Sequence, residues 1–178
     1  MMYQNISELL YEELDEEEDK DTQQLIDDLK DVRGRGCFIK EEFVKMGMWK
    51  SSRAKNWYLS NSPEDVVNTS KKVFSTKYEK RRIELLTTLQ GVRIPTASAI
   101  LMLTNPKDYG VIDIRVWEVL YQYEEVKVNP TGTNFSFDNW YNYLMKLRYF
   151  AEKHQVKARD IERTLFKHDY KIHKGNLY

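Results

Sequence analysis

The sequence has little of three residues that usually shape small domains: one cysteine, seven glycines and four prolines in 178 residues. A single thiol, Cys37, excludes an internal disulfide framework and any four-cysteine metal or iron–sulfur site. Few glycines and prolines argue against a fold rich in sheets and tight turns. No apolar run approaches the roughly 18–20 residues that cross a bilayer, so we expect no membrane partner.

The N-terminus also lacks the positive charge of a signal or transit peptide. Residues 1–32 hold 12 acidic and 2 basic side chains, and we therefore expect a cytoplasmic protein. Residues 33–178 hold 26 basic and 16 acidic side chains. A basic surface favours a polyanionic partner because each phosphate contact releases counterions. The same excess of positive charge also fits an ordinary solvated surface.

Helical periodicity is present along most of the chain, and no segment alternates like a strand. Ser62, followed by Pro63 and Asp65, is a typical helix start. We therefore expect an all-α fold of about eight or nine short helices. We expect an acidic helical extension (1–32) followed by a domain (33–178), with a flexible break at RGRG, residues 33–36. The domain is expected to have either one helical lobe or two lobes with a cleft between them.

The stretch LLTTLQGVRIPTASAIL, residues 85–101, predicts two helices joined by a tight turn. Gly91 is a usual left-handed residue after a helix, and Pro95 can open the next one. The first N–H groups of that second helix, together with its dipole, form an anion site. Arg93 would add charge there and Thr96 a hydroxyl. The alternative is a corner between helices that binds nothing.

Asp113 stands in YGVIDIRVW, directly before another apolar-periodic segment. Aspartate in this position is a good helix N-cap, worth about 1 kcal/mol. The cap position would also hold the carboxylate in a fixed place. Arg115 follows inside the helix, where it could reach a phosphate beside Asp113 or pair with Asp113 and keep it ionised.

A second stretch, MWKSSRAKNWY at residues 48–58, interleaves cations with aromatic rings. This composition suits phosphates and an unstacked base, and makes Lys50 and Arg53 candidate DNA contacts. In the alternative interpretation, its tryptophans anchor a loop to the core. The three histidines have no metal-site spacing, and no glycine-rich nucleotide loop occurs, so we expect neither metal nor cofactor.

LQGVRIPTASAIL, followed by NPKDYGVIDIRVW, resembles the signature of the helix-hairpin-helix–Gly/Pro/Asp (HhH-GPD) superfamily of base-excision DNA glycosylases. In that family a Leu-Pro-Gly-Val-Gly turn leads into a Thr-Ala-rich helix, and Val-Asp begins a later helix. The residues in register are Leu89, Gly91, Val92, Thr96, Ala97 and Asp113. The resemblance covers roughly residues 80–123 and implies a compact glycosylase-like domain built around a helix-hairpin-helix motif.

The resemblance also implies roles for these residues. The amides of the turn at Gly91 and Val92 would grip a phosphate of double-stranded DNA. Asp113 would be the catalytic carboxylate, stabilising an oxocarbenium-like sugar and orienting a water molecule. The target nucleotide would first leave the base stack. We expect a monomer without an iron–sulfur cluster.

Two positions depart from the family pattern. Arg93 replaces a glycine, and would carry about 1 kcal/mol of strain if that position needs positive φ. Pro95 stands where strand-nicking members have the lysine that forms a Schiff base with the sugar. The resemblance therefore implies a monofunctional glycosylase acting on a modified or mismatched base, or a DNA-binding module that has lost catalysis.

The acidic leader and the basic C-terminal segment, residues 164–178, each leave alternatives open. The leader can be two solvated helices packed on the body, a partner-binding arm, or an autoinhibitory strip over the basic face. The C-terminal segment can follow DNA or fray.

Overall fold

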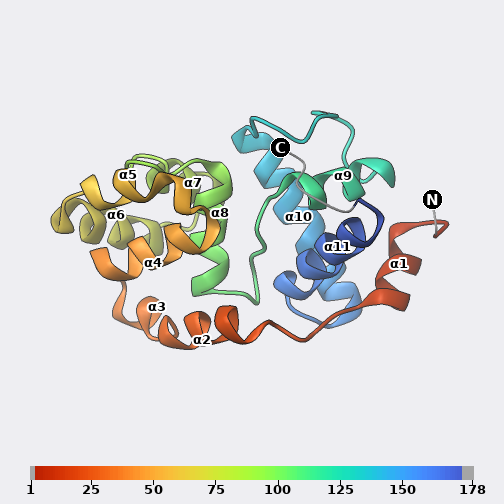
Figure 1. Ribbon diagram of the computed structural model, residues 1–178, viewed down its shortest axis with the longest axis horizontal. Coiled ribbons are helices and arrows are strands. Elements are labelled where there is room, and N and C mark those ends of the chain that lie inside the picture. Colours follow the sequence, from red (N-terminus) through yellow and green to blue (C-terminus); the bar gives the residue numbers. More distant parts are fainter. Residues whose placement is uncertain (1–2, 174–178) are drawn as a thin grey trace. The chain divides into compact units, whose positions relative to one another are not determined.

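The computed structural model describes residues 3–173, and within that range every regular element is a helix and none is a strand. The all-α fold expected from the sequence is therefore confirmed. The helices, shown in Figure 1, are α1 (Ile6–Glu13), α2 (Lys20–Asp28), α3 (Val32–Arg35), α4 (Lys40–Lys50), the 3-10 helix η1 (Ser52–Ala54), α5 (Lys55–Ser60), α6 (Pro63–Ser75), α7 (Glu79–Leu86), α8 (Ile94–Thr104), α9 (Ile114–Gln122), α10 (Phe137–His154) and α11 (Ala158–Ile172). None of these helices is both long and apolar enough to span a membrane.

The chain folds into two compact units. Residues up to Glu17 join those from Pro106 onward in what we call the terminal unit, and Glu18–Asn105 form the central unit. The acidic segment 1–32, expected as a separate extension, is divided between them: α1 belongs to the terminal unit and α2 to the central unit. The C-terminal segment is helical in α11 up to Ile172, and residues 174–178 lie outside the described range.

Helix α1 is an integral part of the terminal unit. Its apolar side chains Ile6, Leu9 and Leu10 are 2%, 0% and 0% exposed, and the helix packs against α11. Burying side chains of this size contributes about 1.5–3 kcal/mol each. This part of the acidic leader is therefore held by apolar packing, in addition to its charges.

The helix signals read from the sequence have mixed outcomes. The hydroxyl of Ser62 accepts a hydrogen bond from the Asp65 N–H at 3.0 Å, and Pro63 opens α6, as predicted. The prediction of a flexible break at residues 33–36 is wrong, because these residues belong to α3 and its left-handed cap at Gly36. Burial of Val32 anchors this short helix, which glycine content alone did not reveal.

Helix α8 is the core of the central unit. All of its residues from Thr96 to Thr104 are buried, so the helix is enclosed around its whole circumference. Aromatic side chains pack nearby in the same unit, including Phe43, whose ring meets that of Tyr58 edge to face at 5.8 Å. A helix surrounded in this way gives its first turn, and the chain entering it, a fixed position.

Candidate nucleic-acid interface

The α7–α8 turn spans residues 87–93 and contains the predicted left-handed glycine. Gly91 has a φ of +83°, a conformation that glycine adopts without steric cost. The Val92 N–H donates to the carbonyl of Leu89 at 3.1 Å and closes the turn. Helix α7 ends at Leu86, earlier than predicted, so the turn is longer than the sequence pattern indicated.

Arg93 carries no backbone strain, which corrects the expectation drawn from the missing glycine. Its φ is −109°, an extended conformation open to any residue, and it is the N-cap of α8. The helix then starts with Ile94 and Pro95. The N–H groups of Ile94 and Thr96 have no acceptor inside the helix, since the residues that would accept precede its start. The start of α8 therefore leaves two backbone N–H groups without a partner inside the helix, and the anion site at this position stays a prediction.

An open hollow of about 510 Å³ lies beside the turn. One wall consists of Arg53, Ala54 and Trp57, and the other of residues 87–93. Arg53 and Arg93 are both exposed, and no ion pair joins either guanidinium to an acid within residues 3–173. Two cations, an exposed tryptophan and a helix start thus share one concave surface of the central unit.

Asn61 fixes this surface, and the sequence analysis missed it. Its side-chain amide nitrogen donates to the carbonyl oxygens of Trp57 at 3.0 Å and Gln90 at 3.1 Å. Its side-chain oxygen accepts the Gln90 N–H at 2.8 Å. Asn61 is 6% exposed, and a lone asparagine before a serine gives no sequence signal of this role. The contact ties α5 to the turn.

Three of the predicted DNA contacts are not placed as expected in the central unit. Thr96 is only 6% exposed, so its hydroxyl is not a surface group, because α8 is enclosed from its first turn onward. Val92 is equally buried, and the N–H that was predicted to grip a phosphate donates instead to the Leu89 carbonyl. Lys50 ends α4, is partly buried, and is not among the residues that line the hollow.

Asp113 belongs to the terminal unit and is the N-cap of α9. One carboxylate oxygen accepts the Arg115 N–H at 3.1 Å, which confirms the capping prediction. The residue is partly exposed. Its backbone has an extended conformation, with φ −140° and ψ 154°, as N-cap residues usually do. The carboxylate is therefore held by the helix that it begins.

Arg115 has a structural position, which corrects its assignment as a phosphate contact. The residue is 6% exposed, and its guanidinium donates to the Asp169 carboxylate at 2.6 Å and to the His173 carbonyl at 3.0 Å. The ring of Tyr170 lies 5.1 Å from the guanidinium carbon. A buried guanidinium with these partners cannot also contact a phosphate on the surface.

Glu118, Asp169 and His173 come together in the same unit, with ligand atoms within 4.8 Å of one another. Burial, followed by the charge of Asp169, raises the pKa of Glu118 above its ordinary value. The two oxygens of Asp169 accept from Arg115 and contact Nδ1 of His173 at 2.9 Å. Asp169 thus already has the guanidinium of Arg115 as its counter-charge.

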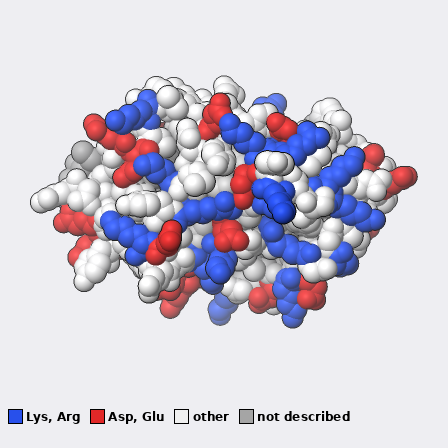
Figure 2. Space-filling model, turned by 180° about the vertical axis from the view of Figure 1, so that it is seen from behind, with Lys and Arg blue, Asp and Glu red and all other residues white. Residues whose placement is uncertain are grey.

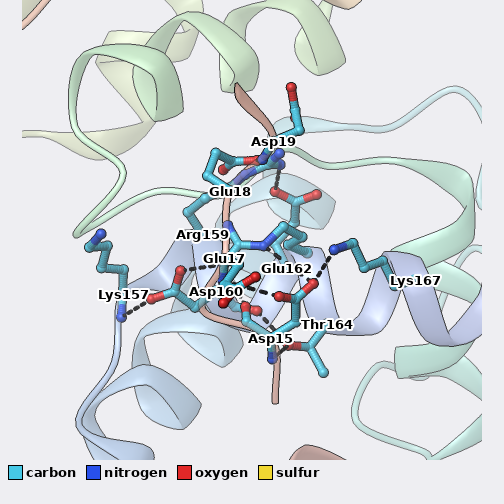
Figure 3. A network of polar contacts seen from close by, with 11 residues as sticks. Asp15, Glu17, Glu18, Asp19, Lys157, Arg159, Asp160, Glu162, Thr164 and Lys167 are labelled. Atoms are coloured by element: carbon cyan, nitrogen blue, oxygen red, sulfur yellow. Dashed lines mark hydrogen bonds and ion pairs between the residues drawn. The ribbon is translucent and has the colours of Figure 1, made fainter. Parts of the chain in front are cut away.

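The basic side chains of α11 are neutralised by acids of the same unit. Figure 3 shows Asp15 between Thr164, whose hydroxyl accepts the Asp15 N–H at 3.0 Å, and Lys167, which pairs with the carboxylate. Glu13 accepts from Lys171 at 2.8 Å and contacts His168 at 3.0 Å. These contacts leave α11 with little free positive charge. On the face seen in Figure 2, acidic side chains are likewise interspersed among the basic ones.

Comparison of the chain with models of protein families, with curated proteins and with solved structures found no match.

Proposed function

We propose that this chain binds double-stranded DNA through its phosphates, using the α7–α8 turn and the hollow beside it. The observation that carries the proposal is the pair of exposed guanidiniums of Arg53 and Arg93 next to the first turn of α8, neither of which pairs with an acid among residues 3–173. Helix N-termini favour anions, and arginines that neutralise phosphates release condensed counterions. The resemblance of residues 80–123 to the HhH-GPD superfamily supports duplex DNA as the partner. In this proposal the protein binds DNA as a monomer in the cytoplasm.

A salt titration with duplex DNA tests this proposal. The logarithm of the binding constant is expected to fall linearly with the logarithm of salt concentration, and Arg93→Gln should reduce the slope by about 1. Arg81→Gln is the matched control, because Arg81 is an exposed arginine of the same unit that pairs with Glu84 at 3.0 Å. Its slope should equal that of the wild type.

Two results would contradict the proposal. Binding without a salt slope would remove phosphate contacts altogether. Equal losses of slope for Arg93→Gln and Arg81→Gln would mean that the turn holds no special site and that any exposed arginine contributes alike.

Hydrolysis of a glycosidic bond, with Asp113 as the carboxylate, is a second candidate function. The observation that favours it is a partly exposed acid held in a fixed place by the N–H of Arg115. Such a carboxylate would stabilise the positive charge that develops on the sugar and orient the attacking water. Pro95 supplies no amine, so the strand would stay intact after the base leaves.

Duplexes carrying a panel of modified or mismatched bases, treated with hot alkali after incubation, test the second candidate. Asp113→Asn should abolish any alkali-labile product, while stability is retained because asparagine is also a good N-cap. A product that survives this substitution would remove Asp113 from the mechanism. Strand breaks formed without alkali would contradict the inference drawn from Pro95. Absence of product on every duplex would leave the DNA-binding function alone.

A further inference from the structure

Trp57 is the most exposed of the four tryptophans. Trp57 is 61% exposed, whereas Trp117 and Trp140 are fully buried. Trp49 is partly buried, and its indole N–H donates to the Thr22 hydroxyl at 2.9 Å. An indole left in water forgoes the stabilisation that burial of a large aromatic ring gives. Trp57 therefore does not contribute its ring to the core of the central unit.

The position of Trp57 is nevertheless fixed. Asn61 bonds both the Trp57 carbonyl and the backbone of Gln90, so helix α5 and the turn are joined. On the other side, a Cβ placed on Gly91 would lie 2.8 Å from the Trp57 Cβ, so the two backbones are in close contact. The backbone and Cβ that carry the indole are therefore already in place before a ligand packs against the ring.

The hollow around Trp57 has the size and charge of a nucleotide site. Its volume of about 510 Å³ lies within the usual range of about 300–1,000 Å³ for small-molecule sites. Arg53 from η1 and Trp57 from α5 both line it, and Arg93 lines it from the turn. A flat apolar ring beside two exposed guanidiniums complements a ligand that is flat at one end and anionic at the other.

We propose that the hollow holds an unpaired nucleotide of DNA, its base stacked on Trp57 and its phosphate between Arg53 and Arg93. A base inside a duplex has both faces covered by its neighbours, so only an unpaired base can offer a face to the indole. The inference rests on the proposed function, since it assigns a substrate class to the same phosphate-binding surface. It predicts a preference for duplexes with a single-stranded flank.

Three DNA ligands test the inference: a blunt duplex, the same duplex with a short thymidine overhang, and the same duplex with an equally long overhang of abasic spacers. The thymidine overhang should bind about fivefold to 150-fold more tightly than the abasic one, the range expected for one stacked base. Trp57→Ala should remove this difference, so that the thymidine and abasic overhangs bind the variant equally well. Tyr78→Ala, which removes a 78% exposed aromatic of the same unit outside the hollow, should keep it.

Tryptophan fluorescence gives a second readout that a change in folding does not imitate. The thymidine overhang should quench the emission of the wild type, and Trp57→Phe, which keeps an aromatic ring, should lose the quenching while retaining part of the preference. Equal binding of thymidine and abasic overhangs by the wild type would overturn the inference while the salt slope on blunt duplex still supports the proposed function. Failure to bind any of the three ligands would overturn both.

Discussion

Two arginines of the terminal unit and two of the central unit are used in opposite ways. In the terminal unit, Arg115 and Arg163 are 6% and 5% exposed, and each lies against a buried aspartate. In the central unit, Arg53 and Arg93 line an open hollow and have no acidic partner within residues 3–173. The same residue type therefore stabilises a fold in one unit and is available to a ligand in the other. Net charge counted along the sequence does not separate these uses.

Loss of the buried ion pair between Arg115 and Asp169 should have the largest effect on stability. Arg115→Ala would leave the Asp169 carboxylate, 1% exposed, without its guanidinium. Breaking a buried pair from one side costs about 3–5 kcal/mol of unfolding free energy. Urea denaturation measures this loss, with Arg53→Ala as the exposed control, expected to change stability by less than about 0.5 kcal/mol. Similar stabilities of the two variants would break the contrast between the units.

A smaller loss of stability is expected at the α7–α8 turn, where the effect comes from backbone geometry and not from charge. Gly91→Ala would place a side chain at φ +83° and a Cβ 2.8 Å from that of Trp57. Left-handed strain of this kind costs about 1–3 kcal/mol. The variant should also lose the thymidine-overhang preference, because Trp57 must move.

Gly34→Ala is the control for this substitution. A Cβ at Gly34, inside α3, would meet nothing within 4 Å, and alanine in a helix is expected to stabilise by about 0.5–1 kcal/mol. Unfolding free energies from urea titrations compare the two. A Gly91→Ala variant as stable as wild type would mean that the turn relaxes without cost.

The smallest expected effect is on the pH dependence of stability, and it tests the charged contacts of the terminal unit. Burial raises the pKa of Glu13, but hydrogen bonds from Lys171, His168 and Tyr3 outweigh it and hold the pKa below its ordinary value. Because the folded-state pKa is lower than the unfolded one, the unfolded chain binds more protons in acid. The stabilisation is complete above about pH 5 and is lost as pH falls through the folded-state pKa.

Glu13→Gln should therefore be less stable than wild type at neutral pH and lose less stability on acidification. Glu12→Gln, a change at the preceding exposed residue, should follow the wild-type curve. Urea titrations across the acid range measure both variants. A Glu13→Gln curve parallel to wild type would exclude this carboxylate as a source of the acid sensitivity.

Local signals in the sequence were sufficient for helix ends and turns. Ser62 and Asp113 cap their helices through their side chains, and Gly91 has the left-handed conformation that the lack of a Cβ allows, since these features depend on neighbours a few residues away. The same reasoning failed at residues 33–36. There, contacts at a distance hold a short helix, among them the hydrogen bond from the Arg33 side chain to the carbonyl of Thr104 at 3.1 Å.

For the candidate site, the sequence named Arg53, Gly91 and Arg93, which the structure brings together around the hollow. It also named Thr96 and Arg115, which are buried. The sequence analysis did not name Asn61. Its side-chain amide donates to Trp57 and Tyr58 in α5 and to Gln90 in the α7–α8 turn, and the sequence does not show that these two segments meet. Exposure and partners depend on packing, which no spacing of residues reports.

The sequence by itself thus determined that the chain is helical, that helices begin after Ser62 and Asp113, and that the turn before α8 needs a glycine at position 91. These features follow from backbone sterics and from hydrogen bonds between near neighbours. Only the tertiary structure decided which arginines are neutralised, which tryptophan remains in solvent and which unit each acidic helix joins. Those outcomes depend on which side chains exclude water from one another, and that is set by contacts between residues far apart in sequence, such as Arg115 with Asp169 and Asp15 with Thr164.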